Sequence, residues 1–597
     1  MQSMSFPELE PMIDGFGYDD TASRSKVAPL DQLVTEFIDS GCSVHFPWLS
    51  SRGSATLFEI IRQCRAGRLR GLTIISASLR AELGLLIGSG GVSRLITAFA
   101  ATSYPSIRSN EFLTAAVRDG AVALEEWSML SLAQRMLAGA LGWPFVPSST
   151  LDGTDLPAGV PPGDELATLV DAASGATHSV MPALRPDVVL IHCPVADWEG
   201  NGVLFPPYAE DVYSAYGSRR GVILTAEQIV PPSVLRRWSS HVRVPAARVL
   251  GVAQVPFGAH PASLHVPIHI EGISGYGEDY DFFREMGSMR TMEDVEVFAK
   301  RWVDVSSRNQ YLAQLGRQRI EHLLVKDFDE SWRADRIDML GGDGPDERQP
   351  AEVIRAGERL AVCGARAMAD LVADAGARTV VAGAGVASLA AGLGCKILGE
   401  RGGAVDLLYE SGVVGYVPRP HDSTLSNSRN LPTARQLTNT LEALGMLVPS
   451  SGESMVALLS AGQIGEDGTC NSNRTSTGKF LVGGGGSTDI ARHVRTIVVL
   501  PAKAGRFTEL IDFVTYWSPA VDGIATDAGF LVRESGEFAL AGWFADLWPD
   551  GQSALRHLRE VTGWDLQLAA GARALDPPTA DELAYLNAID PDANLLG

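Results

Sequence analysis

Short apolar runs that end in tight turns, with helical stretches between them, recur along the whole chain. Five such runs are RTVVAGAGV (378–386), VDLLYE (405–410), MVALLS (455–460), KFLVGG (479–484) and RTIVVLPA (495–502). Earlier in the chain lie GLTIIS (71–76), DVVLIHCPV (187–195) and GVILT (221–225), and helical patterns cover 131–142 and 351–376. Strands that alternate with helices are typical of largely parallel sheets. The pattern therefore predicts an α/β protein.

A charged stretch rich in glycine and proline divides this pattern. The segment DFDESWRADRIDMLGGDGPDERQP, at 327–350, lacks apolar periodicity, as linkers do. The chain has 597 residues, more than one hydrophobic core usually serves. We therefore predict a domain at 1–326, a linker at 327–350 and a second domain at 351–597.

A faint internal repeat indicates that the two domains are related. The segment VVLIHCPVADWEGNG (188–202) is an apolar run followed by an acidic turn with glycine and asparagine. The segment MVALLSAGQIGEDGTCN (455–471) has the same shape and falls in the other proposed domain. One repeat in each half favours two copies of one fold.

The charge of the chain limits the partners it can have. A formal net charge of −22 argues against a nucleic acid or an anionic membrane, but it allows a small anion held by a local patch. No apolar run reaches membrane-spanning length, and the acidic N-terminus lacks a signal-peptide core. The six cysteines form no CxxC pair. These features predict a cytoplasmic protein.

Glu410 is the first candidate for chemistry. It ends the apolar run VDLLYE, and the small residues Ser411 and Gly412 follow it. Ligands of α/β proteins gather at the carboxyl ends of parallel strands. A carboxylate at such a place can act as a base, an acid or a covalent nucleophile. For an arbitrary glutamate, a solvated strand end remains the commoner explanation.

Two glycine-rich turns are candidates for binding an anion. The segments VAGAGVAS (381–388) and VGGGGSTDIA (482–491) each follow an apolar run and open a helix. Exposed backbone N–H groups at such turns bind phosphate or an oxyanion. Each turn alone is equally well explained as a tight strand-to-helix connection. No acidic residue follows at the spacing of a dinucleotide fingerprint, so we do not predict a nucleotide redox cofactor.

Other chemistries have less support. Glu125, Glu126 and Trp127 begin the helical segment 125–147, where an acidic helix start is a sufficient explanation. His260 lacks a ligand partner at metal spacing. The chain contains no HExxH, GxSxG or Walker A motif. We therefore predict no metal.

Taken together, these motifs resemble the class I coenzyme A transferases, in particular the glutaconate CoA-transferase-like branch. The first half is similar to the α subunit in its order of motifs: LIGSGGVSRL (86–95), EEWSMLSLAQRMLAGALGWPFVP (125–147), PVADWEGNG (194–202), TAEQIVP (225–231) and FGAHPAS (257–263). The second half is similar to the β subunit: VAGAGVASLAA (381–391), LLYESGVVG (407–415), GQIGEDGTCN (462–471) and VGGGGSTDIA (482–491). The resemblance covers most of the chain and implies α and β subunits fused in one polypeptide.

The resemblance implies a fold and an activity. The fold is two related, doubly wound α/β domains that form a pseudo-dimer, and the fused chain is expected to form a homodimer. The activity is transfer of coenzyme A between an acyl-CoA and a carboxylic acid, with CoA as co-substrate. Glu410 would be the nucleophile, forming first a mixed anhydride and then a γ-glutamyl–CoA thioester. Exchange of one thioester for another needs neither ATP nor metal.

The resemblance also assigns roles to neighbouring residues. Ser411 and Gly412 would make room for the anhydride. Backbone N–H groups of the two glycine turns would bind oxyanions or CoA; these residues are Gly383, Gly385, Val386, Gly484, Gly485 and Gly486. The loop 42–55 departs from the family, because Phe46, Pro47 and Trp48 stand where small residues are common. Trp48 and Arg52 of this loop would lie in the acyl pocket. Because the loop is atypical, the identity of the substrate is not predicted.

Two other functions remain open on the sequence. Some relatives resemble transferases but hydrolyse a C–C bond of a β-keto acyl-CoA, using a glutamate of the α-like chain as base. Glu125 and Glu126 occupy the matching segment and would then line the substrate pocket with Trp127. Hydrolysis of a thioester belongs to the same alternative. A non-catalytic acyl-CoA-binding protein is a third possibility, although retention of Glu410 favours transfer.

Overall fold

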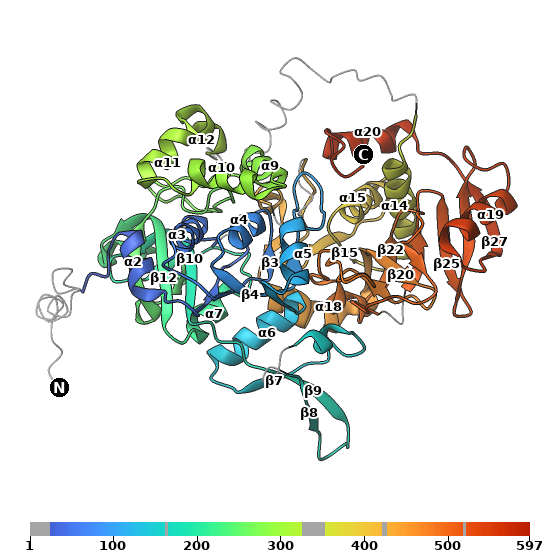
Figure 1. Cartoon of the computed structure of the whole chain (residues 1–597). Coiled ribbons are helices and arrows are strands. Elements are labelled where there is room, and N and C mark those ends of the chain that lie inside the picture. The colour runs from blue at the N-terminus through green and yellow to red at the C-terminus, as the bar shows by residue number, and fades with distance from the viewer. Residues whose placement is uncertain are drawn as a thin grey trace, which may run out of the picture.

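The structure is a computed structural model that describes residues 24–49, 51–160, 165–324, 353–420, 427–517 and 521–596. The described residues form two halves that lie side by side (Figure 1). Each half is built around one large sheet, of nine strands in the first and ten in the second. The predicted linker 327–350 lies outside the described residues, as do the boundaries proposed on either side of it.

The first half contains a parallel sheet with neighbours in the order β14–β12–β10–β1–β2–β4–β6. Its longest strands are apolar, and all ten residues of β10 are buried, as expected where helices cover both faces of a parallel sheet. The strand bounds are β1 Ser43–His45, β2 Leu72–Ile75, β4 Val92–Thr97, β6 Ala123–Glu126, β10 Val188–Asp197, β12 Gly221–Val230 and β14 Val249–Gln254. The short antiparallel strands β11 Gly202–Val203 and β13 Val242–Val244 extend it.

Helices surround this sheet. They are α2 Leu30–Phe37, α3 Ser54–Arg65, α4 Leu83–Gly88, α5 Glu111–Arg118, α6 Met129–Ala140 and α7 Asp211–Gly217. Four further helices, α9 Tyr280–Ser288, α10 Met292–Trp302, α11 Arg308–Leu315 and α12 Arg317–Leu323, form a layer at the top of this half in Figure 1. A small antiparallel sheet of β7 Phe145–Pro147, β9 Thr177–Pro182 and β8 Ala167–Val170 projects at the bottom.

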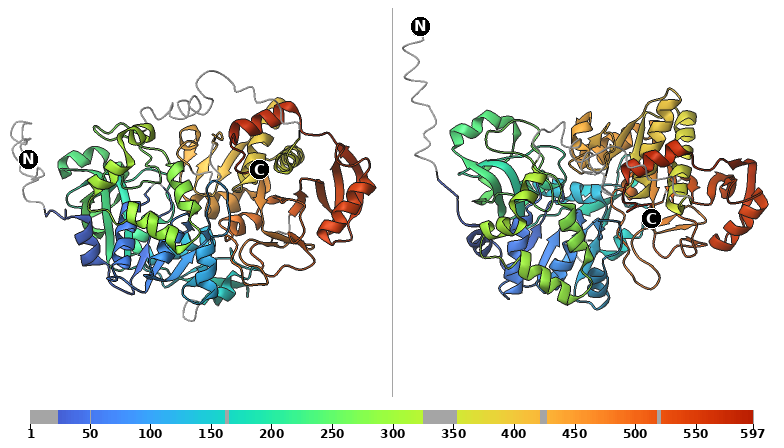
Figure 2. Two further views of the ribbon diagram at one scale, coloured as in Figure 1. Left: turned by 45° about the horizontal axis from the view of Figure 1, so that its top comes forward. Right: turned by 90° about the horizontal axis from the view of Figure 1, so that it is seen from above.

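The second half contains five parallel strands in the order β16–β15–β19–β22–β24. Their bounds are β15 Thr379–Ala382, β16 Asp406–Tyr409, β19 Met455–Ser460, β22 Arg495–Val499 and β24 Val521–Ala525. The principal helices are α14 Ala356–Ala375, α15 Val386–Glu400, α18 Ser487–Ala491, α19 Gly551–Thr562 and α20 Ala580–Ile589. The strands β25 Gly529–Glu534, β26 Glu537–Phe544 and β27 Gln567–Leu575 continue the sheet at the end away from the first half (Figures 1 and 2).

The two sheets share one strand order. Read along the chain, β1, β2, β10, β12 and β14 occupy the same relative places as β15, β16, β19, β22 and β24. The two repeat segments supply β10 and β19, which lie next to the first strand of each sheet. The prediction of two related α/β halves is therefore confirmed.

One predicted strand is wrong. Residues 479–484 form an irregular segment instead of a strand. Their backbone groups bond outside the large sheet: the N–H of Val482 donates to Ser472 O over 3.1 Å, and the N–H of Ala100 donates to Val482 O over 2.8 Å. The apolar residues of this segment are thus used at the boundary between the halves.

No helix in the described ranges is both long enough and apolar enough to cross a membrane.

Candidate active site

A cavity of about 580 Å³ lies between the two halves. Its first-half wall comes from loops after β1, β2, β5 (Phe99–Ala100) and β6, and its second-half wall comes from the ends of parallel strands. The sequence-predicted residues that line it are Trp48, Gly383, Gly385, Val386, Glu410, Gly484 and Gly485. A pocket at the carboxyl ends of parallel strands, where two units meet, is a common place for a ligand.

Glu410 lies at the wall of this cavity, one residue after β16. Its Oε2 accepts a hydrogen bond of 2.7 Å from the backbone N–H of Gly486. Burial raises the pKa of Glu410 to about 7; the Gly486 N–H acts in the opposite direction, and the nearby Asp489 carboxylate adds to the increase. A carboxylate with a raised proton affinity beside an open cavity is suited to proton transfer or to nucleophilic attack.

The turn that supplies this N–H is held by the first half. The Gly485 N–H donates to Ala98 O over 3.0 Å, and the Met129 N–H donates to Gly485 O over 3.1 Å. Gly485 has φ of +57°, and a Cβ added at Gly486 would overlap Glu410 Oε2. The turn needs glycine because the carboxylate approaches the backbone this closely.

Some backbone N–H groups of the predicted anion site already have a hydrogen-bond acceptor, and others do not. The Gly383 N–H donates to Leu458 O over 2.8 Å, the Gly485 N–H is used by Ala98, and the Gly486 N–H is used by Glu410. Among the described residues, no acceptor is found for the N–H groups of Gly385, Val386 and Gly484. The first two lie at the N-terminal end of the 15-residue helix α15, where the helix dipole favours an anion.

Ser411 and Gly412 do not open space beside Glu410. Ser411 is completely buried, and neither residue lines the cavity. Gly412 has φ of +91°, and a Cβ there would lie 2.5 Å from the backbone N of Asn439. The Thr438 N–H also donates to Gly412 O over 2.8 Å. Gly412 is small because the backbone at 438–439 packs against it. This corrects the expectation that Gly412 makes room for the substrate.

Glu125, Glu126 and Trp127 are buried behind the cavity and do not line it. Glu125 forms ion pairs with Arg94 and, at 3.2 Å, with Arg135, and it accepts a 2.6 Å hydrogen bond from the Trp127 indole. Both Glu125 oxygens therefore already have partners.

Glu126 connects the two halves. Its carboxylate pairs with Arg474 and accepts a hydrogen bond from the Asn473 side chain, and both partners belong to the second half. A carboxylate with these partners is an unsuitable base, because a general base needs an oxygen within reach of the substrate proton. The structure thus separates the two acids of the first half from the cavity.

The atypical loop after β1 contributes one of its two predicted residues. Trp48 lines the cavity, whereas Arg52 is buried beneath it and pairs with Glu82. The Arg52 guanidinium also donates to Trp48 O over 3.2 Å, and burial lowers the pKa of Arg52 to about 10. Arg52 therefore supports the loop.

Three arginines of the cavity wall were not predicted from the sequence: Arg80, Arg108 and Arg506. Within the described part of the chain, none of them has a carboxylate at ion-pair distance, although the chain has 71 acidic residues against 49 basic ones. Unpaired cations that are partly removed from water are costly, so an anionic ligand is expected there. The three lie in separate segments without a common motif, and no pattern in the sequence joins them.

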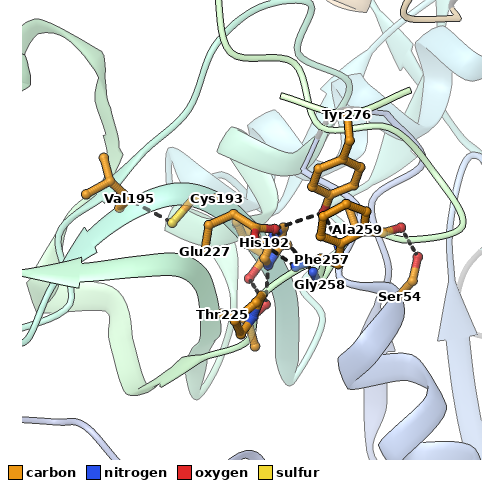
Figure 3. Close-up of polar contacts among 12 residues, drawn as sticks. Ser54, His192, Cys193, Val195, Thr225, Glu227, Phe257, Gly258, Ala259 and Tyr276 are labelled. Atoms are coloured by element: carbon orange, nitrogen blue, oxygen red, sulfur yellow. Dashed lines mark hydrogen bonds and ion pairs between the residues drawn. The ribbon is translucent and has the colours of Figure 1, made fainter. Parts of the chain in front are cut away.

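A second polar cluster supports the first-half wall from outside the cavity (Figure 3). His192 Nε2 lies 2.8 Å from Glu227 Oε1, and the Tyr276 hydroxyl donates to the same oxygen over 2.9 Å. The Phe257 N–H donates to Glu227 Oε2 over 2.8 Å. Ser54, the first residue of α3, donates to Ala259 O over 2.8 Å. The cluster thus anchors the motif FGAHPAS to the helix that follows the Trp48 loop.

His260 of that motif has a similar structural role. It is buried, and its two ring nitrogens lie 2.7 Å from the Tyr311 hydroxyl and 2.9 Å from Asp279 Oδ2. Arg319 pairs with the same aspartate. Within the described residues, no group of three or more His, Cys, Asp or Glu side chains is arranged to hold a metal ion.

Comparison with known proteins identifies relatives of this chain. Residues 30–254 match the family model described as Coenzyme A transferase. One of the subunits of glutaconate CoA-transferase from Acidaminococcus fermentans is 26% identical over 318 residues, which cover 50% of this chain and 95% of that protein. One of the subunits of 3-oxoadipate CoA-transferase from Pseudomonas knackmussii is 29% identical over 245 residues, covering 40% and 83%.

A solved structure matches both halves. An acyl-CoA transferase from Escherichia coli O157:H7, in a thioester complex with CoA, aligns with a TM-score of 0.62 over 95% of this chain and 97% of its own. The sequences are 13% identical, so this similarity concerns the fold. The two proteins share a fold of two α/β halves in one chain. Residues 30–254, within the first half, are similar to the coenzyme A transferases.

Proposed function

We propose that the chain transfers coenzyme A from an acyl-CoA to a carboxylic acid, with Glu410 as the nucleophile. The observation that supports this most is the position of Glu410 at the wall of the cavity between the halves, with the Gly486 N–H on its Oε2. A carboxylate is a competent covalent nucleophile towards a thioester, which is an activated acyl group.

The reaction divides into balanced steps. Glu410 attacks the thioester carbonyl, the C–S bond breaks, and CoA thiolate leaves a mixed anhydride between Glu410 and the acyl group. The thiolate then attacks the γ-carbonyl of Glu410, which releases the first acid and leaves a γ-glutamyl–CoA thioester. A second carboxylate attacks this thioester and the same steps run in reverse. No water or net proton is consumed. The order of events is ping-pong, because the first acid leaves before the second carboxylate reacts.

The cavity wall fits these intermediates. The free N–H groups of Gly385, Val386 and Gly484 are available to an oxyanion or to CoA. The guanidinium groups of Arg80, Arg108 and Arg506 suit the phosphates of CoA and the carboxylate of the acid. The hydrolytic alternative is less well supported, because Glu125 and Glu126 are ion-paired away from the cavity.

Mass spectrometry tests the proposal directly. The protein is mixed, without an acceptor acid, with a panel of acyl-CoAs that includes the thioesters of glutaconate and 3-oxoadipate, the acids in the names of the two relatives. CoA attached to Glu410 is the expected result, with reduction by borohydride and trapping by hydroxylamine at the same residue. Turnover of a thioester without any CoA adduct would contradict the covalent route.

The plot of reaction rate against pH should fall on its acid side, with a midpoint near neutral pH; this fall is called the acid limb below. The nucleophile must be ionised, and its pKa is raised from 4.5 to about 7. Below that pH Glu410 is mostly protonated, so kcat/KM should rise with pH up to about 7 and then level off. Steady-state rates between about pH 5 and 9 measure this limb. A profile that is flat down to pH 5 would mean that Glu410 keeps an ordinary pKa or does not react.

We extend the proposal to assembly and expect a homodimer. Large apolar side chains are exposed on and before the small projecting sheet: Trp143 (53% exposed), Phe145 (44%), Leu169 (45%) and Val170 (61%). Apolar side chains exposed on a projecting sheet are candidates for a contact between subunits. Light scattering at micromolar concentration should give twice the chain mass of 63.6 kDa. A single-chain mass under these conditions would exclude the dimer.

A further inference from the structure

Asp489 is an acidic residue of the second half whose side-chain hydrogen-bond partners belong to the first half. It is 1% exposed and does not line the cavity. Its Oδ1 accepts hydrogen bonds from the hydroxyl groups of Ser128, over 2.6 Å, and of Thr150. Its Oδ2 accepts the backbone N–H of Leu130 over 3.0 Å. Asp489 is therefore a buried carboxylate whose two oxygens are both hydrogen-bonded, and these bonds join the second half to the first.

The connection lies three residues from the N–H that Glu410 uses. Asp489 belongs to α18, a single turn of helix whose N-cap is Gly486. A turn this short moves as one unit, so a tie at Asp489 also fixes the direction of the Gly486 N–H. The other ties of the segment, from Ala98 and Met129 to Gly485, lie on the side before Gly486. After Gly486, the ties to the first half are Asp489, which is buried, and the C-cap residue Arg492, whose guanidinium donates to Asp152 O over 3.2 Å.

We propose that Asp489 is a positioning residue, which holds the Gly486 amide on Glu410 by fastening α18 to the first half. The proposal rests on the proposed function of Glu410. The first half then contributes to the reaction without touching the nucleophile, through the N-terminal end of α6 and the loop that carries Thr150.

Two effects of Asp489 on Glu410 have opposite signs. Through the Gly486 N–H, which stabilises the ionised form, Asp489 lowers the pKa of Glu410; through its own negative charge it raises that pKa. The hydrogen bond is the larger of the two influences. Apart from burial and the Gly486 N–H, the pKa of Glu410 is affected by two side chains, Tyr409 and Asp489. The pKa of Asp489 is in turn affected by burial and by its three hydrogen-bond donors. Loss of the tie and loss of the charge therefore move the acid limb in opposite directions.

Asp489→Ala tests the role through the rate of CoA adduct formation at Glu410. The maximal rate should fall about a hundredfold, because a donor misplaced by about 1 Å costs on this order. The KM for acyl-CoA should change less than about threefold, since Asp489 does not line the cavity. The acid limb should move to higher pH. An unchanged maximal rate of adduct formation would overturn the positioning role.

Thr150 provides a second test that keeps the charge of Asp489 and replaces Asp489→Ala if that variant fails to fold. Thr150→Val retains the volume but loses the hydroxyl that donates to Asp489. We expect a rate about threefold to tenfold lower with the limb again at higher pH, and restoration of both in Thr150→Ser. If Thr150→Val and Thr150→Ser had the same rate and the same acid limb in the pH profile, the proposal would be refuted. If wild-type protein forms no adduct at Glu410, the proposed function fails and the positioning role fails with it.

Discussion

Glu410→Gln should abolish exchange of coenzyme A between acids and should leave no CoA adduct on the protein. Glutamine keeps the size of the side chain but lacks the anionic oxygen that attacks the thioester. We expect a loss of about a thousandfold or more, because no neighbouring group can replace a covalent step. Exchange of labelled CoA between two acids measures the loss. Full turnover by Glu410→Gln would remove the transferase mechanism.

Glu410→Asp refines this test. Aspartate retains the charge but withdraws it by one methylene group, about 1.5 Å, and a displacement of that size costs on the order of a hundredfold. We therefore expect Glu410→Asp to lie between wild type and Glu410→Gln. Equal activities of Glu410→Asp and Glu410→Gln would mean that position matters as much as charge.

Glu125→Gln and Glu126→Gln are the contrasting variants. Each removes the charge of a buried, ion-paired carboxylate, so each should lower the thermal unfolding temperature. Neither residue lines the cavity, so folded Glu125→Gln and Glu126→Gln should still form the CoA adduct. A hydrolase that used either acid as its base would show the reverse, with a severe loss in these variants and a mild one in Glu410→Gln.

Gly486→Ala should also have a large effect on the reaction. Gly486 has φ of −93°, which alanine adopts without strain, so the backbone itself tolerates the change. The added methyl group, however, would overlap Glu410 Oε2 and lie 3.1 Å from Leu444 Cδ1. The carboxylate must move away from its N–H donor, and we expect a fall in the adduct-forming rate of about a hundredfold.

Gly399→Ala is the matched control for this prediction. Gly399 lies in α15, and a Cβ added there meets no atom within 4 Å. Gly399 lies in the last turn of α15, where alanine is still favoured over glycine, so Gly399→Ala should keep the rate and leave the unfolding temperature equal or slightly higher. If Gly486→Ala were as active as Gly399→Ala, the close approach of Glu410 to the turn would have no part in the reaction.

Much of the fold could be predicted because strand and helix patterns are local. The runs at 187–195, 405–410 and 455–460 were recognisable from apolar residues between turns, and they became β10, β16 and β19. The run at 479–484 has a similar composition, but its backbone bonds to Ser472 in its own half and to Ala100 in the first half. Composition cannot separate these cases, since the partner of an apolar run is decided by tertiary contacts.

Those parts of the candidate site that lie within one short sequence motif were predictable. Glu410 was found from its place after a strand, and the glycine turns from their positions before helices. The reason for Gly412 was not predictable, because the backbone at 438–439 that packs against it is remote in sequence. The same applies to Glu125 and Glu126, whose partners Arg94 and Arg474 come from other segments.

The grip of the first half on the turn at 482–486 has a consequence for how this protein is produced. A second half made alone would contain Glu410 but would lack Ala98, Met129 and the partners of Asp489, which hold its donor in place. Two separate subunits must meet at cellular concentrations to supply these contacts. Tethering raises the effective concentration of the partner to about the millimolar range and fixes the ratio of the halves at one to one. Every translated chain therefore carries its own partner.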